Sequence, residues 1–276
     1  QTVEDLFTVA SLGFRGEALS SIASIAQVEL ITKTGDALSG SRYCIDGGEE
    51  KSLEEVGAPE GTTFLVRNLF YNTPARRKFL KSPTTEGAHI ADLVEKIALS
   101  HPEVSIRFIQ NGQSRLHTSG NHNLRDIIYT VYGREIAANL LPVEMGEEPV
   151  KLSGFIGKPL IARGNRNFET YFINGRYIKS SLISKAVEDA YKPFMMQHKY
   201  PFTMLNFAIA PSFLDVNVHP AKMELRFRDG EMIYKMVYHT ISMALSEREL
   251  IPGVELGQTQ KKEAPLKPVH VQRPEP

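Results

Sequence analysis

The stretch SLGFRGEALSSIA, residues 11–23, contains the turn and the helix start on which the fold assignment depends. Gly13 and Gly16 flank Arg15 and precede a short apolar, serine-rich segment that we predict to be a helix. Glycines adopt backbone conformations closed to other residues, and the first N–H groups of a helix lack partners inside it, so this stretch could hold a phosphate group. The alternative is an ordinary glycine turn with Glu17 in the first helical turn. Spacing alone favours the turn, because glycine turns vastly outnumber phosphate sites.

The composition is that of a globular protein with room for two domains. The 276 residues are 42% hydrophobic and 23% charged, with 32 Lys and Arg against 32 Asp and Glu. This balance argues against a disordered chain, and no apolar run approaches the roughly 18 residues of a membrane-spanning helix. The single cysteine, Cys44, cannot form an internal disulfide, so we expect a reducing, cytoplasmic setting. Because the net charge is zero, nucleic-acid binding would depend on local basic patches.

Apolar periodicity and turn signals predict an α+β chain. Asn111-Gly112 and Asn174-Gly175 are expected to close tight hairpins, and Gly133 to end a helix. We expect a first domain at 1–119, a second at 120–250 and a linker from 251 to 276, where Pro, Gln, Lys and Glu dominate. The expected strands are 28–32, 42–45, 62–70, 104–109, 114–117, 150–156, 169–173, 177–179, 204–209 and 214–218, and the expected helices are 3–10, 17–23, 74–81, 86–100, 124–132, 182–191 and 232–245.

Two groups of basic residues are candidates for a nucleic-acid interface. The first lies on a short helix expected to begin at Pro74, with Thr73 as its capping residue. The second lies in and around the hairpin at 174–175. Such runs more often form a solvated surface than a binding site. The first group is Arg76, Arg77, Lys78 and Lys81, and the second is Arg163, Arg166, Arg176 and Lys179.

Three single residues by themselves give little evidence of a functional site. Lys222 follows His219-Pro220, where proline interrupts a strand, but an isolated lysine is most often a solvated surface charge. His219 has no second His or Cys at ligand spacing, and Cys44 has no partner motif. We therefore predict structural roles for both and no metal site.

Four strings together resemble the MutL family of DNA mismatch repair proteins, in their order and in their spacing. The resemblance extends from about residue 1 to about residue 248 and so includes both expected domains. It implies a GHKL-type ATP-binding α/β sandwich, incomplete in this chain, followed by a ribosomal-protein-like βαβ domain. The strings are GFRGEAL at 13–19, LFYNTPARRKFL at 69–80, FINGRYI at 172–178 and DVNVHPAKMELRF at 215–227.

The resemblance also implies a nucleotide site. The string at 13–19 matches the family's ATP lid, whose backbone amides surround the phosphates. Thr62 matches a threonine at the adenine end, although threonine is also an ordinary strand former. Lys222 matches a lysine that reaches the γ-phosphate from the second domain and is our catalytic candidate, because an ammonium group can neutralise charge on a transferring phosphoryl group. The expected nucleotide contacts are Gly13, Arg15, Gly16, Glu17, Ala18, Leu19, Thr62 and Lys222.

For DNA, the resemblance implies binding with little sequence preference along a groove of basic residues. Lys78 and Arg176 align with positions implicated in that binding. Contacts to the phosphate backbone would make the affinity fall steeply with salt. The expected DNA contacts are Arg77, Lys78, Arg163, Arg166 and Arg176.

The family's hydrolytic residues have no match in this chain. They are a glutamate that activates water, an asparagine that holds Mg²⁺, and an Asp-x-Gly-x-Gly loop for adenine, and residues 1–12 hold no candidate for any of them. The chain begins roughly 75 residues into the family pattern, so we expect this set upstream. General-base catalysis needs an acceptor within reach of the attacking water. We therefore expect this chain alone to bind ATP weakly or not at all, and to lack ATPase activity.

The leading hypothesis is a mismatch-repair switch that uses ATP and Mg²⁺ to close a homodimeric clamp. Its expected partners are DNA, a mismatch-recognition protein of MutS type, and a downstream nuclease or helicase. One alternative is a non-catalytic DNA-binding module, whose salt-dependent binding to duplex DNA would not respond to ATP. Another is a different GHKL ATPase, such as a topoisomerase subunit, although the string NTPARRKFL argues against it.

Overall fold

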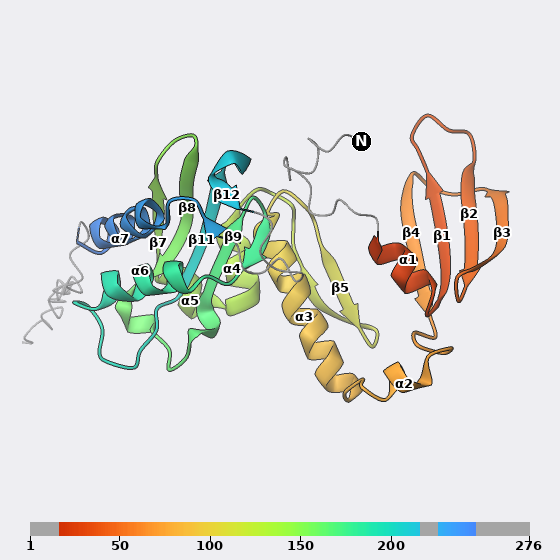
Figure 1. Cartoon of the computed structure of the whole chain (residues 1–276), viewed down its shortest axis with the longest axis horizontal. Coiled ribbons are helices and arrows are strands. Elements are labelled where there is room, and N and C mark those ends of the chain that lie inside the picture. Colours follow the sequence, from red (N-terminus) through yellow and green to blue (C-terminus); the bar gives the residue numbers. More distant parts are fainter. Residues whose placement is uncertain (1–16, 216–225, 247–276) are drawn as a thin grey trace, which may run out of the picture.

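The computed structural model describes residues 17–215 and 226–246, and it contains two main sheets with a long helix and a hairpin between them (Figure 1). The predicted helix 3–10 and the predicted linker after 251 lie outside these ranges. The helices are α1 Glu17–Ala23, α2 Pro74–Arg77, α3 Pro83–Ser100, α4 Leu124–Tyr132, α5 Arg134–Ala138, α6 Ser181–Tyr191 and α7 Gly230–Ser246, with short 3-10 helices η2 Pro159–Ile161, η3 Arg166–Phe168 and η4 Pro211–Phe213. The strands are β1 Gln27–Lys33, β2 Gly40–Asp46, β3 Glu49–Val56, β4 Gly61–Arg67, β5 Arg107–Gln110, β6 Gln113–His117, β7 Leu140–Met145, β8 Val150–Gly157, β9 Glu169–Ile173, β10 Arg176–Ile178, β11 Thr203–Ile209, β12 Leu214–Asp215 and β13 Arg226–Phe227.

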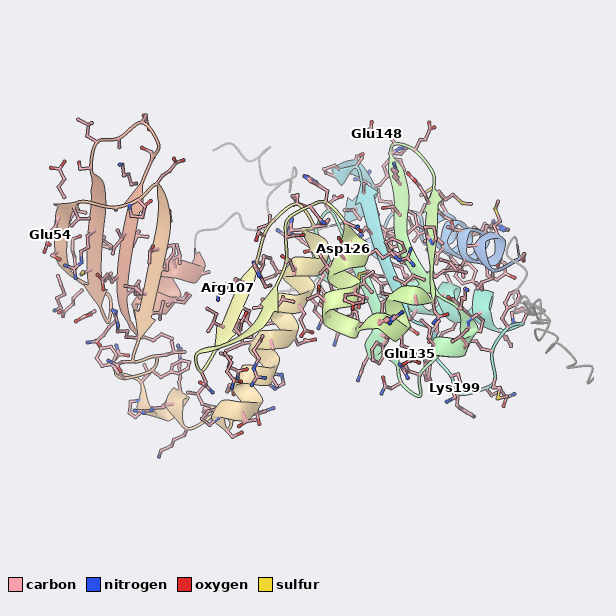
Figure 2. All side chains as sticks on the ribbon, turned by 180° about the vertical axis from the view of Figure 1, so that it is seen from behind. Glu54, Arg107, Asp126, Glu135, Glu148 and Lys199 are labelled. Atoms are coloured by element: carbon pink, nitrogen blue, oxygen red, sulfur yellow. The ribbon has the colours of Figure 1, made fainter. Side chains whose placement is uncertain are left out.

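The first sheet has four antiparallel strands in the order β3-β2-β1-β4. Strands β1 and β2, both predicted, form an antiparallel pair. Strand β3 was not predicted, because its sequence EEKSLEEV is mostly charged and shows no hydrophobic alternation. Gly47 and Gly48, with φ of 58° and 90°, form the tight turn that folds this acidic segment back onto β2. Figure 2 shows Glu54 on this outer strand, at the edge of the first sheet.

Strand β4 corrects the predicted buried strand at 62–70 in both length and burial. It ends at Arg67, because Asn68 and Phe70 adopt positive φ of 53° and 64°. Phe64 is 45% exposed and Val66 is 46% exposed. These values are high because β4 is an edge strand of its sheet and contributes to neither buried cluster of the described chain.

The second sheet has the order β10-β9-β11-β8-β7. Strands β9 and β11 run parallel and are connected through β10 and α6, which gives the predicted βαβ arrangement. Asn174 and Gly175, with φ of 48° and 78°, form the predicted hairpin turn between β9 and β10. Helices α6 and α7 pack together over one face of the sheet, where the side chains of Val187, Tyr191 and Ile241 are fully buried.

The opposite face of the second sheet is covered by helices from the middle of the chain. A second buried cluster joins Ala98 and Leu99 of α3 and Ile128 of α4 to Phe172 and Met204 of the sheet. One cluster therefore contains residues from both sides of position 119, and the division into domains at that point stays a prediction. None of the described helices is long and apolar enough to cross a membrane.

Candidate functional site

The predicted nucleotide site lies only partly within the described residues. Gly13, Arg15, Gly16 and Lys222 lie outside them. Helix α1 begins at Glu17, so Ala18 and Leu19 form its first turn, and both are exposed. The structure thus places the end of the predicted lid at the start of a helix, as the sequence indicates.

The C-terminal end of α1 is fixed to the first sheet by main-chain hydrogen bonds. The N–H of Gly48 donates to the carbonyl of Ala23 at 2.9 Å, and the N–H of Phe70 donates to the carbonyl of Ile25 at 2.8 Å. The side-chain amide of Asn72 donates to the carbonyl of Ser24 at 2.9 Å. These contacts set the position of α1 relative to the turn between β2 and β3 and to the segment that leads into α2.

Thr62 lies at the far end of β1 from α1. Its cross-strand neighbour is Thr32, and the two Oγ1 atoms lie 2.8 Å apart. Thr32 is five positions along β1 from Gln27, where β1 begins after α1, which corresponds to roughly 17 Å at 3.3 Å per residue. Thr62 therefore lies about a strand's length from the C-terminal end of α1.

The segment that contains Lys222 has both of its ends in one small sheet. Strands β12 and β13 pair antiparallel, with Leu214 opposite Phe227. The described residues on either side of positions 216–225, Asp215 and Arg226, are therefore neighbours in this sheet. No group of three or more His, Cys, Asp or Glu side chains in residues 17–215 and 226–246 is arranged to hold a metal ion.

The first basic group is exposed and has no acidic partner among the residues that the structure describes. Helix α2 contains Arg76 and Arg77, whereas Lys78 is its C-cap residue and Lys81 lies beyond it. All four are exposed, and none forms an ion pair within the described residues. Thr73 occupies the N-cap position as predicted, but it makes no capping hydrogen bond, and its Oγ1 is buried without a partner in the described structure. Positive charge at α2 is thus available to a ligand.

The second basic group is partly neutralised by acidic residues. Arg166 donates through Nε and Nη2 to the two carboxylate oxygens of Glu188, at 2.5 and 3.0 Å. Arg163 lies 3.8 Å from a carboxylate oxygen of Glu135. Arg176 begins β10 and is half-buried. Figures 1 and 2 place α2 at the link between the first sheet and α3, apart from the second sheet, so the structure does not gather the two basic groups into one patch.

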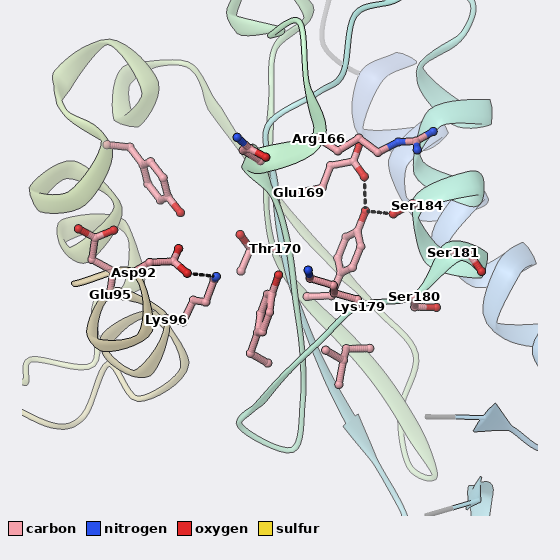
Figure 3. Close-up of a pocket in the computed structure, with 15 residues that line it drawn as sticks. Asp92, Glu95, Lys96, Arg166, Glu169, Thr170, Lys179, Ser180, Ser181 and Ser184 are labelled. Atoms are coloured by element: carbon pink, nitrogen blue, oxygen red, sulfur yellow. Dashed lines mark hydrogen bonds and ion pairs between the residues drawn. The ribbon is translucent and has the colours of Figure 1, made fainter. Parts of the chain in front are cut away.

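A cavity of about 570 Å³ lies beside the second group, between α3 and α4 on one side and β9, β10 and the start of α6 on the other (Figure 3). Glu169 lines it and is buried, and burial raises the pKa of this carboxyl from 4.5 to about 7. Burial also raises the pKa of Tyr132, to about 12. Glu169 was not a predicted site residue, because a glutamate at the start of a strand gives no local signal of burial.

The sequence of this chain is similar to those of known proteins. The chain is 60% identical to the DNA mismatch repair protein MutL of Agathobacter rectalis over 270 residues, which are 98% of this chain and 41% of that protein. The chain belongs to the MutL family. The MutL of Thermoanaerobacter pseudethanolicus is 41% identical over 252 residues, which are 91% of this chain and 41% of that protein. The family model for the C-terminal domain of DNA mismatch repair proteins matches residues 128–246. The chain thus spans about two fifths of the length of these MutL relatives.

Solved structures confirm the predicted fold class for this MutL-family chain. The crystal structure of the N-terminal domain of a DNA repair protein matches with a TM-score of 0.72 at 24% identity, over 86% of this chain and 77% of the other. The Aquifex aeolicus MutL ATPase domain complexed with ADP matches with a TM-score of 0.58 at 23% identity, over 86% and 80%. The B-subunit of Myxococcus xanthus DNA gyrase has a TM-score of 0.55 at 12% identity, over 90% and 81%. At such identities these matches concern the fold alone.

Proposed function

We propose that this chain is part of a MutL-type mismatch repair protein that acts as an ATP-dependent switch and binds DNA. The observation that carries the proposal is the 60% identity to a MutL protein over 98% of the chain. The fold shared with a MutL ATPase domain solved with ADP supports nucleotide binding. The same proposal includes Mg²⁺, a homodimeric clamp, a MutS-type partner, a downstream nuclease or helicase, and a cytoplasmic location.

In this proposal the nucleotide phosphates bind near the start of α1. Gly13 and Gly16 would give the backbone its freedom there, and Arg15 would add charge. Glu17, Ala18 and Leu19 would offer the first helical amides, and Thr62 would serve the other end of the nucleotide. Lys222 would neutralise charge at the γ-phosphate, because a compact ammonium group suits a transferring phosphoryl group.

The proposed DNA surface is centred on α2. Arg77 and Lys78 are exposed and have no acidic partner among the described residues, so DNA phosphates would not compete with a carboxylate for them. Arg163, Arg166 and Arg176 would contribute less each, since Arg166 is held by Glu188 and Arg163 lies near Glu135. Binding of this kind depends on phosphate charge and not on base sequence.

Calorimetry tests the proposed ATP binding in two proteins, the 276-residue chain and a chimera. The 276-residue chain should bind ATP weakly or not at all, and a micromolar dissociation constant for the chain alone would contradict this. A chimera in which the chain replaces the matching part of Agathobacter rectalis MutL should bind and hydrolyse ATP. Lys222→Ala in the chimera should lower kcat strongly, whereas Lys51→Ala, which alters an exposed lysine of β3, should not. A chimera that binds duplex DNA but ignores ATP would favour the non-catalytic module.

A further inference from the structure

Glu169 is a buried carboxyl group with too few hydrogen-bond donors for a full negative charge. Its exposed fraction is 8%. Oε2 accepts a hydrogen bond from the hydroxyl of Tyr171 at 3.0 Å, whereas Oε1 is buried without a partner in the described structure. An ionised carboxylate offers about four acceptor sites, and leaving most of them unsatisfied in a dry environment is costly. The geometry by itself therefore favours the protonated form.

The groups that face Glu169 come from every element packed around it. From α6, Ser184 shares the Tyr171 hydroxyl at 3.2 Å, and from β11, Thr203 is the register partner of Glu169. The charged groups nearby are Arg166 of η3 and Glu188 of α6, and Lys179 lies after β10 on the same side of the cavity. Across the cavity are Asp92, Glu95 and Lys96 of α3 and Tyr132 of α4. Lys96 is already paired with Asp92 at 2.5 Å. Arg166 is the cation whose charge favours the ionised form of Glu169.

Arg166 connects this buried carboxyl to the protein surface. Its guanidinium group is held by Glu188 and lies over the ring of Tyr200, 5.0 Å from the centroid. Figure 3 shows the Arg166 side chain next to the Glu169 carboxyl and extending toward α6. Arg166 thus interacts with one carboxylate when Glu169 is neutral and with two when Glu169 is ionised.

We propose that protonation of Glu169 controls how strongly the surface around Arg166 attracts DNA phosphates, an inference that rests on the DNA binding proposed above. With Glu169 neutral, the charges of Arg166 and Glu188 cancel. With Glu169 ionised, the group formed by Arg166, Glu188 and Glu169 is negative and repels phosphate. Water screens the buried charge of Glu169 less than it would screen an exposed charge. The pKa of Glu169, raised by burial to about 7, places this change between about pH 6 and pH 8.

The test is the affinity of the 276-residue chain for a short DNA duplex, measured by fluorescence anisotropy at constant low ionic strength. The wild-type dissociation constant should rise about threefold to tenfold between about pH 6 and pH 8. Glu169→Gln should keep the affinity measured at acid pH throughout this range. Glu144→Gln removes an exposed carboxylate of β7 and should keep the wild-type pH dependence. Groups that the three proteins share contribute equally to each pH profile, so their effects cancel in the comparison.

Two further variants keep the inference open to refutation. Glu169→Asp retains a titrating carboxyl and should retain a pH dependence. Arg166→Ala, introduced both into the wild-type protein and into the Glu169→Gln variant, should keep a difference between those two proteins and move it to higher pH, because Arg166 lowers the pKa of Glu169. Far-UV circular dichroism checks that each variant is folded. A wild-type affinity that does not change with pH, or a Glu169→Gln protein that follows the wild-type profile, overturns the inference. Wild-type protein that binds no duplex at any pH would instead refute the proposed DNA binding.

Discussion

The side chain of Asn174 holds the main chain of Ile209 at both of its polar groups. The N–H of Ile209 donates to Oδ1 of Asn174 at 2.9 Å, and Nδ2 of Asn174 donates to the carbonyl of Ile209 at 2.8 Å. Asn174 stands at φ 48° in the turn between β9 and β10. The turn residue thus continues the pairing of β9 with β11 beyond the end of β9.

Replacing Asn174 with Gly should lower the free energy of unfolding by about 2 kcal/mol, because two main-chain groups of Ile209 lose their partner while glycine keeps the positive φ. Urea unfolding measures the loss. Asn111→Gly is the matched control, since Asn111 has φ 51° before Gly112 and makes no side-chain hydrogen bond within the described residues. Equal effects of the two substitutions would contradict the role of the Asn174 amide.

Gly154 should tolerate no side chain. Its φ is 141°, and a Cβ atom there would lie 2.0 Å from the carbonyl oxygen of Met204 on the neighbouring strand. Gly154→Ala must therefore disturb the pairing of β8 with β11, and we expect a loss of about 3 kcal/mol or more in the free energy of unfolding. Gly164→Ala, where a Cβ meets no atom within 4 Å, should change it by less than about 0.5 kcal/mol. A well-folded Gly154→Ala protein of normal stability would show that the strand contact is wrong.

Glu169 should make the folded state less stable as pH rises. Its pKa is about 7 in the folded protein against 4.5 as the ordinary value, so between these limits the folded state binds a proton that the unfolded chain has released. The free energy of unfolding then falls with rising pH across this window, by at most about 3 kcal/mol, and is constant above it. The measurable quantity is the difference between wild type and Glu169→Gln in urea unfolding at several pH values. A difference that does not change between about pH 5 and pH 7 would contradict the buried carboxyl.

Removing charge at α2 should weaken DNA binding more than removing charge at Arg166. Arg77→Ala and Lys78→Ala each remove a cation without an acidic partner in the described part of the chain, so each should reduce the slope of log affinity against log salt by about one. Arg166→Ala should have a smaller effect, because Glu188 already neutralises this arginine. Lys51→Ala, which alters a lysine paired with Glu49, is the control for general loss of positive charge. Equal salt slopes for all these proteins would exclude α2 as the DNA surface.

Much of the secondary structure follows from local sequence signals. The Asn-Gly turns adopt the expected positive φ, and Gly133 ends α4 at φ 85°. The apolar stripe of the last helix is buried at Ile233, Val237, Ile241 and Leu245, as its spacing indicates. Strand β7 was missed because Pro142 argues against a strand, and its edge position in the sheet explains why proline is tolerated there.

Some features of the candidate sites also follow from local sequence, whereas others depend on tertiary packing. The strings that resemble MutL are properties of the sequence, and so are the exposed cations after Pro74. Local sequence could not show that Glu188 neutralises Arg166 from 22 positions away, or that β4 lies at an edge of its sheet. Both depend on which elements pack together.

By itself, the sequence determined the family, the turns and the helix faces, because φ preferences and side-chain periodicity act between residues that are close along the chain. Only the tertiary structure decided that Glu169 is buried beside Arg166, that Thr62 lies a strand's length from α1, and that one core joins α3 to the second sheet. The physical reason is that loss of water and loss of charge screening depend on every element that surrounds a group, and these elements come from distant parts of the chain.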